Sequence, residues 1–218
     1  GTMKVMASDP LLKNDTIREL VLLKGLMEIY YVQDFNRESI LSILDQVEQR
    51  SKIAESKKIA SNIKKSFSKM SSGSTAPVFT LKDKDGKLLS LADLKGKYVY
   101  LDFWATWCTP CLQEMKLVPA LKKKYGKNII FVSVSIDDDI EKMKAFLAKN
   151  PKYDWVFLHY GNDKNIKDNY NVKSVPSYFL IDPEGKFVQS PAQRPGEIEA
   201  KFNSITRTKE KKYKVGEK

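Results

Sequence analysis

The stretch FWATWCTPC, residues 103–111, holds both cysteines of this 218-residue chain. Cys108 and Cys111 are separated only by Thr109 and Pro110. A disulfide between them would close a very short loop, and the stabilisation that a disulfide gives grows with the length of its loop. Such a bond would do little for the stability of the fold, so the pair is better explained by chemistry than by structure.

A zinc site explains the pair poorly. Structural zinc sites use four ligands, usually cysteine and histidine. The chain has two cysteines and one histidine, His159, far away in the sequence. We therefore expect no metal, and we expect His159 to be an ordinary strand or surface residue.

The residues around the cysteines predict a redox centre. YVYLDFWA, residues 98–105, is a nearly continuous apolar run and predicts a strand buried on both faces. Residues 109–125 predict a helix, so Cys108 lies where the helix begins. Free backbone N–H groups and the helix dipole favour a thiolate there. Cys111, one turn further on, can attack Cys108 after it has reacted with a substrate disulfide.

Strands and helices alternate on both sides of this centre. The hydrophobic patterns predict a hairpin over 77–91 that turns at Asp85-Gly86, and further strands over 128–136, 153–160, 177–182 and 186–190. Helices are predicted over 139–149, 163–170 and 197–205. This order predicts an α/β fold with a mixed sheet.

The first 70 residues have a different pattern. Three helices are predicted, the first starting at Asp9-Pro10, the second capped by Asn36 and the third running from Ser56 to Met70. They form either a small bundle or the remnant of a larger N-terminal domain. Residues 71–76, within SSGSTAP, predict a short flexible linker.

Composition argues against some classes of function. The chain is 42% hydrophobic and 30% charged, with a net charge of +11 that is dispersed except for the tail TRTKEKKYKVGEK. A nucleic-acid-binding protein would need a basic patch or a recognition motif, and none is present. No apolar run is long enough to span a membrane, so we expect any membrane attachment to depend on an anchor outside this sequence.

Three segments together resemble a known family. LDFWATWCTPC, residues 101–111, resembles the active-site segment of the thioredoxin superfamily. Residues 76–111 resemble more specifically the TlpA/ResA-like thiol-disulfide oxidoreductases, and VKSVPSYFLIDPEGKFV, residues 172–188, resembles their cis-proline segment. The resemblance covers about residues 76–206. It implies a thioredoxin-like domain over 77–206 with a central mixed sheet, flanking helices and an N-terminal β-hairpin, and it leaves 207–218 as a basic tail.

The resemblance also implies roles for single residues. Cys108 matches the exposed nucleophile, Cys111 the resolving cysteine and Pro176 the cis-proline beside the thiols. The substrate would contact the backbone of Val175 and the residues around the cysteines, namely Trp107, Thr109 and Pro110. Trp104 and Trp107 match an aromatic shelf near the site. Plain core packing is the alternative, and it is the favoured explanation for Trp104.

Two acids are candidates for accepting the Cys111 proton. Asp102 lies in the apolar strand and matches the buried aspartate of thioredoxins, and Glu114 matches a glutamate of the ResA-like branch. We expect Asp102 to be the main acceptor and Glu114 to tune the thiol pKa. A structural buried acid and a surface salt bridge are the respective alternatives. One departure from the family is Lys116, where a proline is common; here the proline is Pro119.

These observations predict a thiol-disulfide oxidoreductase, acting as a reductant because Thr109-Pro110 offers no histidine to stabilise the thiolate. No cofactor is expected besides the Cys108–Cys111 pair. Expected partners are protein disulfides or dithiols and an unknown electron donor, in the periplasm or cell envelope of a bacterium. Two alternatives remain open: a thiol peroxidase, and a non-catalytic adaptor that binds a partner through its N-terminal helices.

Overall fold

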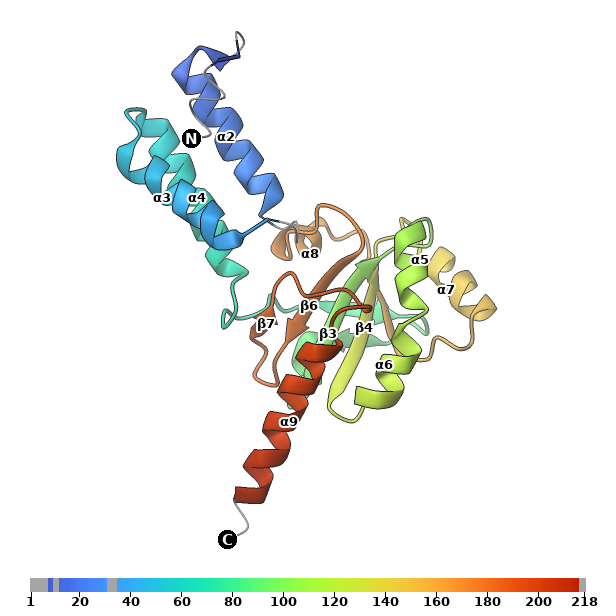
Figure 1. Cartoon of the computed structure of the whole chain (residues 1–218). Coiled ribbons are helices and arrows are strands. Elements are labelled where there is room, and N and C mark those ends of the chain that lie inside the picture. The colour runs from blue at the N-terminus through green and yellow to red at the C-terminus, as the bar shows by residue number, and fades with distance from the viewer. Residues whose placement is uncertain (1–7, 10–11, 31–34, 216–218) are drawn as a thin grey trace. The chain divides into compact units, whose positions relative to one another are not determined.

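The computed structural model describes residues 8–9, 12–30 and 35–215 (Figure 1). The chain divides into two compact units, Gly1–Lys69 and Met70–Lys218. They are called here the helical unit and the sheet unit. In the described part of the chain, no helix is both long and apolar enough to cross a membrane.

Among its described residues, the helical unit contains three helices, α2 (Asp15–Ile29), α3 (Arg37–Arg50) and α4 (Ala54–Lys69). Each contributes apolar side chains to one shared interior, in which the rings of Tyr30 and Phe67 stack with their centroids 3.6 Å apart. The cap predicted at Asn36 is confirmed, because its side chain accepts a hydrogen bond from the backbone N–H of Ser39. This unit is therefore a small bundle held together by its own core.

The start predicted for the first helix, at Asp9-Pro10, includes Pro10, which lies outside the described residues. The first helix that the structure describes begins at Asp15 and is capped by Asn14. The Asn14 side chain accepts hydrogen bonds from the backbone N–H groups of Thr16 and Ile17, at 2.9 and 3.2 Å. An asparagine that satisfies two free N–H groups is a sufficient start signal without a proline.

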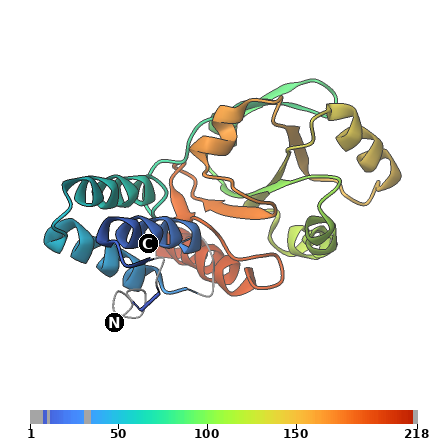
Figure 2. The same cartoon turned by 90° about the horizontal axis from the view of Figure 1, so that it is seen from above.

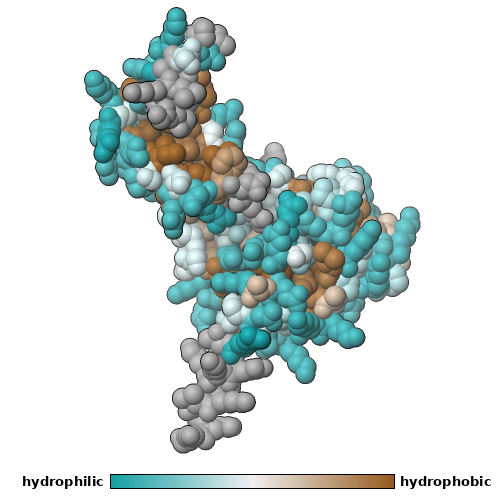
Figure 3. Space-filling view, in the orientation of Figure 1, coloured by the Kyte–Doolittle hydropathy of each residue, from teal (hydrophilic) through white to brown (hydrophobic). Residues whose placement is uncertain are grey.

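Part of α2 does not contribute to this core. Figure 3 shows hydrophobic residues gathered on the surface of the helical unit. Four large apolar side chains of α2 are between 43% and 48% exposed: Ile17, Leu20, Val21 and Met27. The opposite side of α2 supplies the buried Leu22, Leu23 and Leu26. The helix therefore has apolar residues on both its buried and its exposed sides.

The sheet unit is built on a seven-stranded mixed sheet in the order β2-β1-β5-β4-β3-β6-β7. Strands β3, β4 and β5 are parallel, and the other neighbours are antiparallel. This arrangement confirms the predicted mixed sheet and N-terminal hairpin. The strands are β1 (Thr80–Asp83), β2 (Leu88–Ser90), β3 (Tyr98–Trp104), β4 (Ile129–Ser135), β5 (Val156–His159), β6 (Ser177–Ile181) and β7 (Phe187–Gln189).

Helices cover both faces of this sheet (Figure 2). Side chains alternate along β3: Val99, Leu101 and Phe103 pack on the side of α8, while Tyr100 and Trp104 pack on the other side, against α5, α6, α7 and α9. The central strand is thus buried on both faces, as its apolar run predicts. The helical elements are η2 (Leu91–Leu94), α5 (Thr109–Met115), α6 (Val118–Tyr125), α7 (Ile140–Lys149), α8 (Lys164–Asn169) and α9 (Glu199–Val215).

The single helix predicted over 109–125 is two helices. α5 ends at Met115, and α6 starts at Val118 with Pro119 in its first turn. Pro119 has no N–H to donate to the carbonyl of Met115, and its ring would clash with that carbonyl in a continuous helix. The proline therefore ends one helix and begins the next.

The segments at the two ends of the sheet unit also differ from expectation. In the predicted linker, the N–H groups of Gly73 and Ala76 donate to the carbonyls of Phe187 and Gly185, and the N–H of Phe187 donates to Ser74. Residues 73–76 are therefore hydrogen-bonded alongside β7 instead of forming a free linker. At the other end, the backbone of α9 continues to Val215, so most of the predicted tail is helical.

These contacts predict where the sheet unit can be shortened. Met70 is 4% and Ala76 is 1% exposed, and both pack in its core. A fragment of residues 70–218 should therefore be more stable than one of residues 77–218, by about 2–5 kcal/mol for the loss of the Met70 side chain alone. Urea unfolding of the two fragments measures the difference. Equal midpoints would mean that residues 70–76 are not part of the folded unit.

Candidate active site

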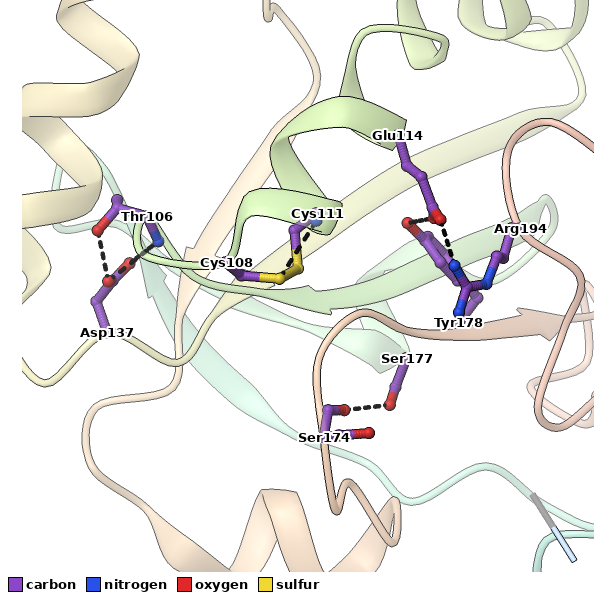
Figure 4. The surroundings of a disulfide bond; sticks show 9 residues. All are labelled: Thr106, Cys108, Cys111, Glu114, Asp137, Ser174, Ser177, Tyr178 and Arg194. Carbon is purple, nitrogen blue, oxygen red and sulfur yellow. Dashed lines mark hydrogen bonds and ion pairs between the residues drawn. A yellow bond between two sulfur atoms is a disulfide. The ribbon is translucent and has the colours of Figure 1, made fainter. Parts of the chain in front are cut away.

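Cys108 and Cys111 form a disulfide at the point where β3 leads into α5 (Figure 4). Cys108 is the N-cap of α5, and its sulfur accepts a hydrogen bond from the backbone N–H of Cys111 at 3.2 Å. The structure thus shows the oxidised form of the predicted pair. The N–H that meets the Cys108 sulfur here is also suited to stabilise a thiolate on Cys108 after reduction.

Both cysteines are largely covered in this oxidised form. Cys108 is 4% and Cys111 is 2% exposed, so the predicted difference in exposure between nucleophile and resolving cysteine is small. The neighbouring Trp107 is 63% exposed, whereas Trp104 is fully buried and packs in the core. Thr109 and Pro110 are exposed. The residues assigned to substrate contact therefore lie at the surface around a buried disulfide.

The proline segment lies against the same cluster. The Val175–Pro176 peptide bond is cis, which confirms the prediction for Pro176. The Val175 side chain packs against the apolar cluster that contains both cysteines. The loop is held by Ser177, whose hydroxyl donates to the Ser174 carbonyl at 2.6 Å (Figure 4). Two segments far apart in the sequence are thus brought together beside the disulfide.

Asp102 is buried in the middle of the sheet, as predicted. Its neighbours across β4 and β6 are Ser133 and Tyr178. The Ser133 hydroxyl donates to the Asp102 carboxylate at 2.5 Å and accepts from the indole N–H of Trp155 at 2.8 Å. Burial raises the pKa of Asp102 to about 7, against the lowering effect of the Ser133 hydrogen bond, and the charge of Glu114 raises this pKa further. The carboxyl can therefore take up and release a proton near neutral pH.

Glu114 is held at both carboxylate oxygens. The Tyr178 hydroxyl donates to one oxygen at 2.6 Å, and the guanidinium of Arg194 pairs with the other at 2.7 Å (Figure 4). Burial raises the pKa of Tyr178 far above its ordinary value, so Tyr178 stays a neutral donor. The predicted salt bridge of Glu114 is present, but the acid also acts electrostatically on Asp102. The two predicted acids are thus coupled.

This coupling predicts opposite effects of two substitutions. Glu114→Gln removes a negative charge that raises the pKa of Asp102, so the midpoint of turnover against pH should move down, by up to about one pH unit. Arg194→Gln removes the cation that partly neutralises Glu114, so the midpoint should move up. The measurement is turnover between pH 5 and 9, with Cys108 alkylation followed over the same range. A shift in the same direction for both variants would contradict the coupling.

One acid of the site was missed from the sequence. Asp137 follows β4, is fully buried, and accepts hydrogen bonds from the backbone N–H and the hydroxyl of Thr106, two residues before Cys108. His159 is a strand residue, as one of the two expected placements had it: it lies at the end of β5, is buried, and its Nε2 lies 2.7 Å from the Asp137 carbonyl oxygen. The available signal was an acid directly after a buried strand. In the part of the chain that the structure describes, no group of three or more His, Cys, Asp or Glu side chains is placed to hold a metal.

Known proteins share this part of the chain. The Redoxin family model matches residues 71–203. The thioredoxin-like protein YneN of Bacillus subtilis is 40% identical over 113 residues, which are 52% of this chain and 66% of YneN. The thiol-disulfide oxidoreductase ResA of the same organism is 37% identical over 55% of this chain and 66% of its own length, and that of Bacillus cereus is 38% identical over 56% and 69%. The matched segment thus spans about two-thirds of these relatives.

Solved structures agree with this relationship. The thioredoxin domain of a thiol-disulfide oxidoreductase from Bacteroides vulgatus superposes with a TM-score of 0.56 at 29% identity, covering 63% of this chain and 97% of that one. A thiol:disulfide interchange protein from a Bacteroides species gives a TM-score of 0.54 at 30% identity, covering 63% and 89%. The family match lies entirely within the sheet unit, where the disulfide and the cis-proline meet. This chain belongs to the Redoxin family, and its sheet unit is a thioredoxin-like domain related to the ResA-type thiol-disulfide oxidoreductases.

Proposed function

We propose that this chain is a thiol-disulfide oxidoreductase that reduces protein disulfides through Cys108 and Cys111. The observation that carries this proposal is the disulfide at the start of α5, packed against Val175 and adjoining the exposed Trp107. This arrangement provides a redox pair, a stabilised sulfur and a surface for an extended substrate segment. The relatives that carry the name thiol-disulfide oxidoreductase support the same class of reaction.

The reaction proceeds in two exchanges. In the reduced protein the Cys108 thiolate attacks one sulfur of the substrate disulfide, and the other substrate sulfur leaves as a thiolate. Cys111 then loses its proton and attacks the Cys108 sulfur. The second substrate sulfur leaves, and the Cys108–Cys111 disulfide forms. The substrate gains the two electrons that the protein loses, and an external electron donor returns the protein to the dithiol form.

The structure supports Cys108 as the first nucleophile. Its sulfur caps α5, whereas Cys111 lies within the first turn of the helix. Asp102 is our choice for the acceptor of the Cys111 proton, because it lies on the α5 side of the sheet and its pKa is raised by burial to about 7. Glu114 adjusts this value through its charge. We assign the backbone of Val175, next to the cis peptide bond of Pro176, to pairing with an extended substrate segment.

The partners follow from this chemistry. Protein disulfides are the substrates, and the electron donor is another thiol protein whose potential is lower. Disulfide substrates persist in oxidising compartments, so we place the protein in the periplasm or cell envelope of a bacterium.

Neither alternative function gains support. A thiol peroxidase uses one cysteine to attack a peroxide, whereas both cysteines here are joined across two residues. An adaptor that acts only through α2–α4 would not need a disulfide, a cis-proline and a buried acid with a pKa of about 7 in one place.

The reduction of insulin by dithiothreitol tests the proposal. The protein should accelerate the precipitation of insulin, and the double variant with both cysteines changed to serine should not. Consumption of hydrogen peroxide is measured in parallel. Peroxide turnover without acceleration of insulin reduction would identify a peroxidase instead.

A further inference from the structure

Asp137 is a buried acid for which the two exchange steps above have no role. It is 0% exposed, and its carboxylate accepts hydrogen bonds from three donors. The backbone N–H of Thr106 lies 3.1 Å from each oxygen, the Thr106 hydroxyl 2.7 Å from one oxygen, and the Ser135 hydroxyl 2.7 Å from the other. An ionised carboxylate accepts without donating, and all three of these donors are neutral groups. A buried negative charge is thus held by neutral donors alone.

The loop that Asp137 holds leads directly to the nucleophile. Residues 105–107 connect β3 to α5 without regular structure, and Cys108 follows. The Cys108 N–H donates to the Ala105 carbonyl at 3.1 Å, so Thr106 is inside the turn that places the nucleophilic sulfur. Figure 4 shows Asp137 and Thr106 on one side of the disulfide, with Glu114 on the other. The position of Cys108 therefore depends on the contact between Thr106 and Asp137.

Asp137 is itself fixed from two sides. Its N–H donates to the Ser135 hydroxyl at 3.1 Å, the same hydroxyl that donates back to its carboxylate. Its carbonyl meets Nε2 of the buried His159 at 2.7 Å, and Nδ1 of this ring accepts from the N–H of Gly161 at 3.1 Å. Because Nδ1 accepts, Nε2 is the nitrogen that donates to Asp137. The single histidine of the chain thus holds the backbone of Asp137 in place through a hydrogen bond.

No cation is paired with this carboxylate among the described residues. The charge of Lys142 interacts with those of Asp137, Asp138 and Asp139, but Lys142 pairs with Asp138 at 2.6 Å on the surface. The pKa of Lys142 is raised mainly by the hydrogen bond that it donates to Asp138, with a smaller contribution from the charge of Asp137. Because opposite charges are strongly attracted in a buried setting, a cation on Asp137 would have cancelled its effect on the nearby sulfur.

We propose that Asp137 is a positioning residue of thiol–disulfide exchange, because it fixes the turn at Thr106 that precedes Cys108. Its negative charge also opposes a thiolate on Cys108, and this effect keeps the Cys108–Cys111 pair reducing. The helix start favours the thiolate, and the carboxylate acts against it. A less stabilised thiolate makes the reduced form less stable and the potential lower. The inference rests on the proposed function, and in it Asp137 is the group that makes the exchange run in the reducing direction.

Asp137→Asn tests both parts of the inference. The substitution removes the charge and replaces one acceptor oxygen by a donor amide. The equilibrium constant against glutathione should shift at least about tenfold toward the dithiol, which is a rise in potential of about 30 mV, and the pH midpoint of Cys108 alkylation should fall. Asp138→Asn is the matched control, because it removes a surface carboxylate one residue along. It should leave both quantities unchanged.

The outcomes separate this inference from the proposed function. An active wild type and an Asp137→Asn variant with unchanged potential and alkylation profile would overturn the inference alone, whereas an inactive wild type would overturn the function. If Asp137→Asn does not fold, the Thr106→Val variant is used as the test. It deletes the hydrogen bond from the Thr106 hydroxyl to Asp137 and keeps the charge of Asp137. It should lower the rate of disulfide opening several-fold at an unchanged potential. An unchanged rate would then overturn the inference.

Discussion

Replacing Cys111 by serine is expected to abolish turnover and to trap substrate proteins on Cys108 as mixed disulfides. Cys108 caps α5 and can still attack a substrate disulfide. The second exchange needs a thiol at position 111, and a serine hydroxyl does not attack a disulfide under these conditions. The mixed disulfide therefore accumulates. Non-reducing gel electrophoresis of the variant with insulin or with an envelope extract measures the adduct.

Cys108→Ser is the matched control for this experiment. It removes the first nucleophile, so it should be equally inactive and should form no adduct, because Cys111 lies within the first turn of α5 and does not cap the helix. Equal amounts of adduct with the two variants would contradict the assignment of the nucleophile. Trapping through Cys111 alone would reverse the roles of the two cysteines.

The second large effect concerns stability. The pKa of Asp102 is raised by burial from 3.8 to about 7, which corresponds to about 4 kcal/mol against its ionised form. Between these two pH values the folded state keeps a proton that the unfolded chain has lost, so the free energy of unfolding falls as the pH rises, and above pH 7 the whole cost is present. Asp102→Asn removes this cost.

The Asp102→Asn protein should therefore be more stable than the wild type at pH 8, by up to about 4 kcal/mol, with the difference vanishing toward pH 4. Urea unfolding at several pH values measures it. Asp154→Asn is a suitable control: Lys122 holds the pKa of this exposed carboxylate below its ordinary value, so the substitution should bring no gain. A stability difference for Asp102→Asn that does not depend on pH would mean that Asp102 has no raised pKa.

The same variant should be slower although it is more stable. Without a carboxyl at position 102, Cys111 lacks the proposed proton acceptor, and general-base catalysis typically contributes about 10²-fold or more. Turnover should fall and lose its dependence on a group with a pKa of about 7, while Cys108 alkylation should stay largely intact. If Asp102→Asn keeps full turnover and Glu114→Gln slows it, Glu114 is the acceptor.

Local patterns were sufficient to predict most of the sheet unit. The apolar run of β3, the start of α5 at Cys108 and the turn at Asp85-Gly86 each depend on neighbouring residues, and the structure has them where they were predicted. The cis peptide bond at Pro176 was predicted from the resemblance to the family. The break between α5 and α6 was missed because the apolar pattern continues through Pro119.

The missed parts of the site depend on contacts between distant segments. Asp137 matters because β4 lies beside β3, which brings its carboxylate to Thr106, 31 residues earlier in the chain. Arg194 reaches Glu114 across 80 residues. Residues 73–76 look like a linker by composition, and only the position of β7 gives their backbone its partners. A local pattern can mark an acid that follows a buried strand, but it does not show which distant segment the acid meets.

The central claim is that Cys108 and Cys111 form a reducing pair, and its reduction potential is the most direct test. Equilibration of the purified protein with defined glutathione or dithiothreitol mixtures, followed by alkylation of the free thiols, gives this value. We predict a potential below about −200 mV, in the range of thioredoxin and the glutaredoxins. A potential near about −120 mV, the value of a strong oxidant such as DsbA, would contradict the account and assign the protein to disulfide formation.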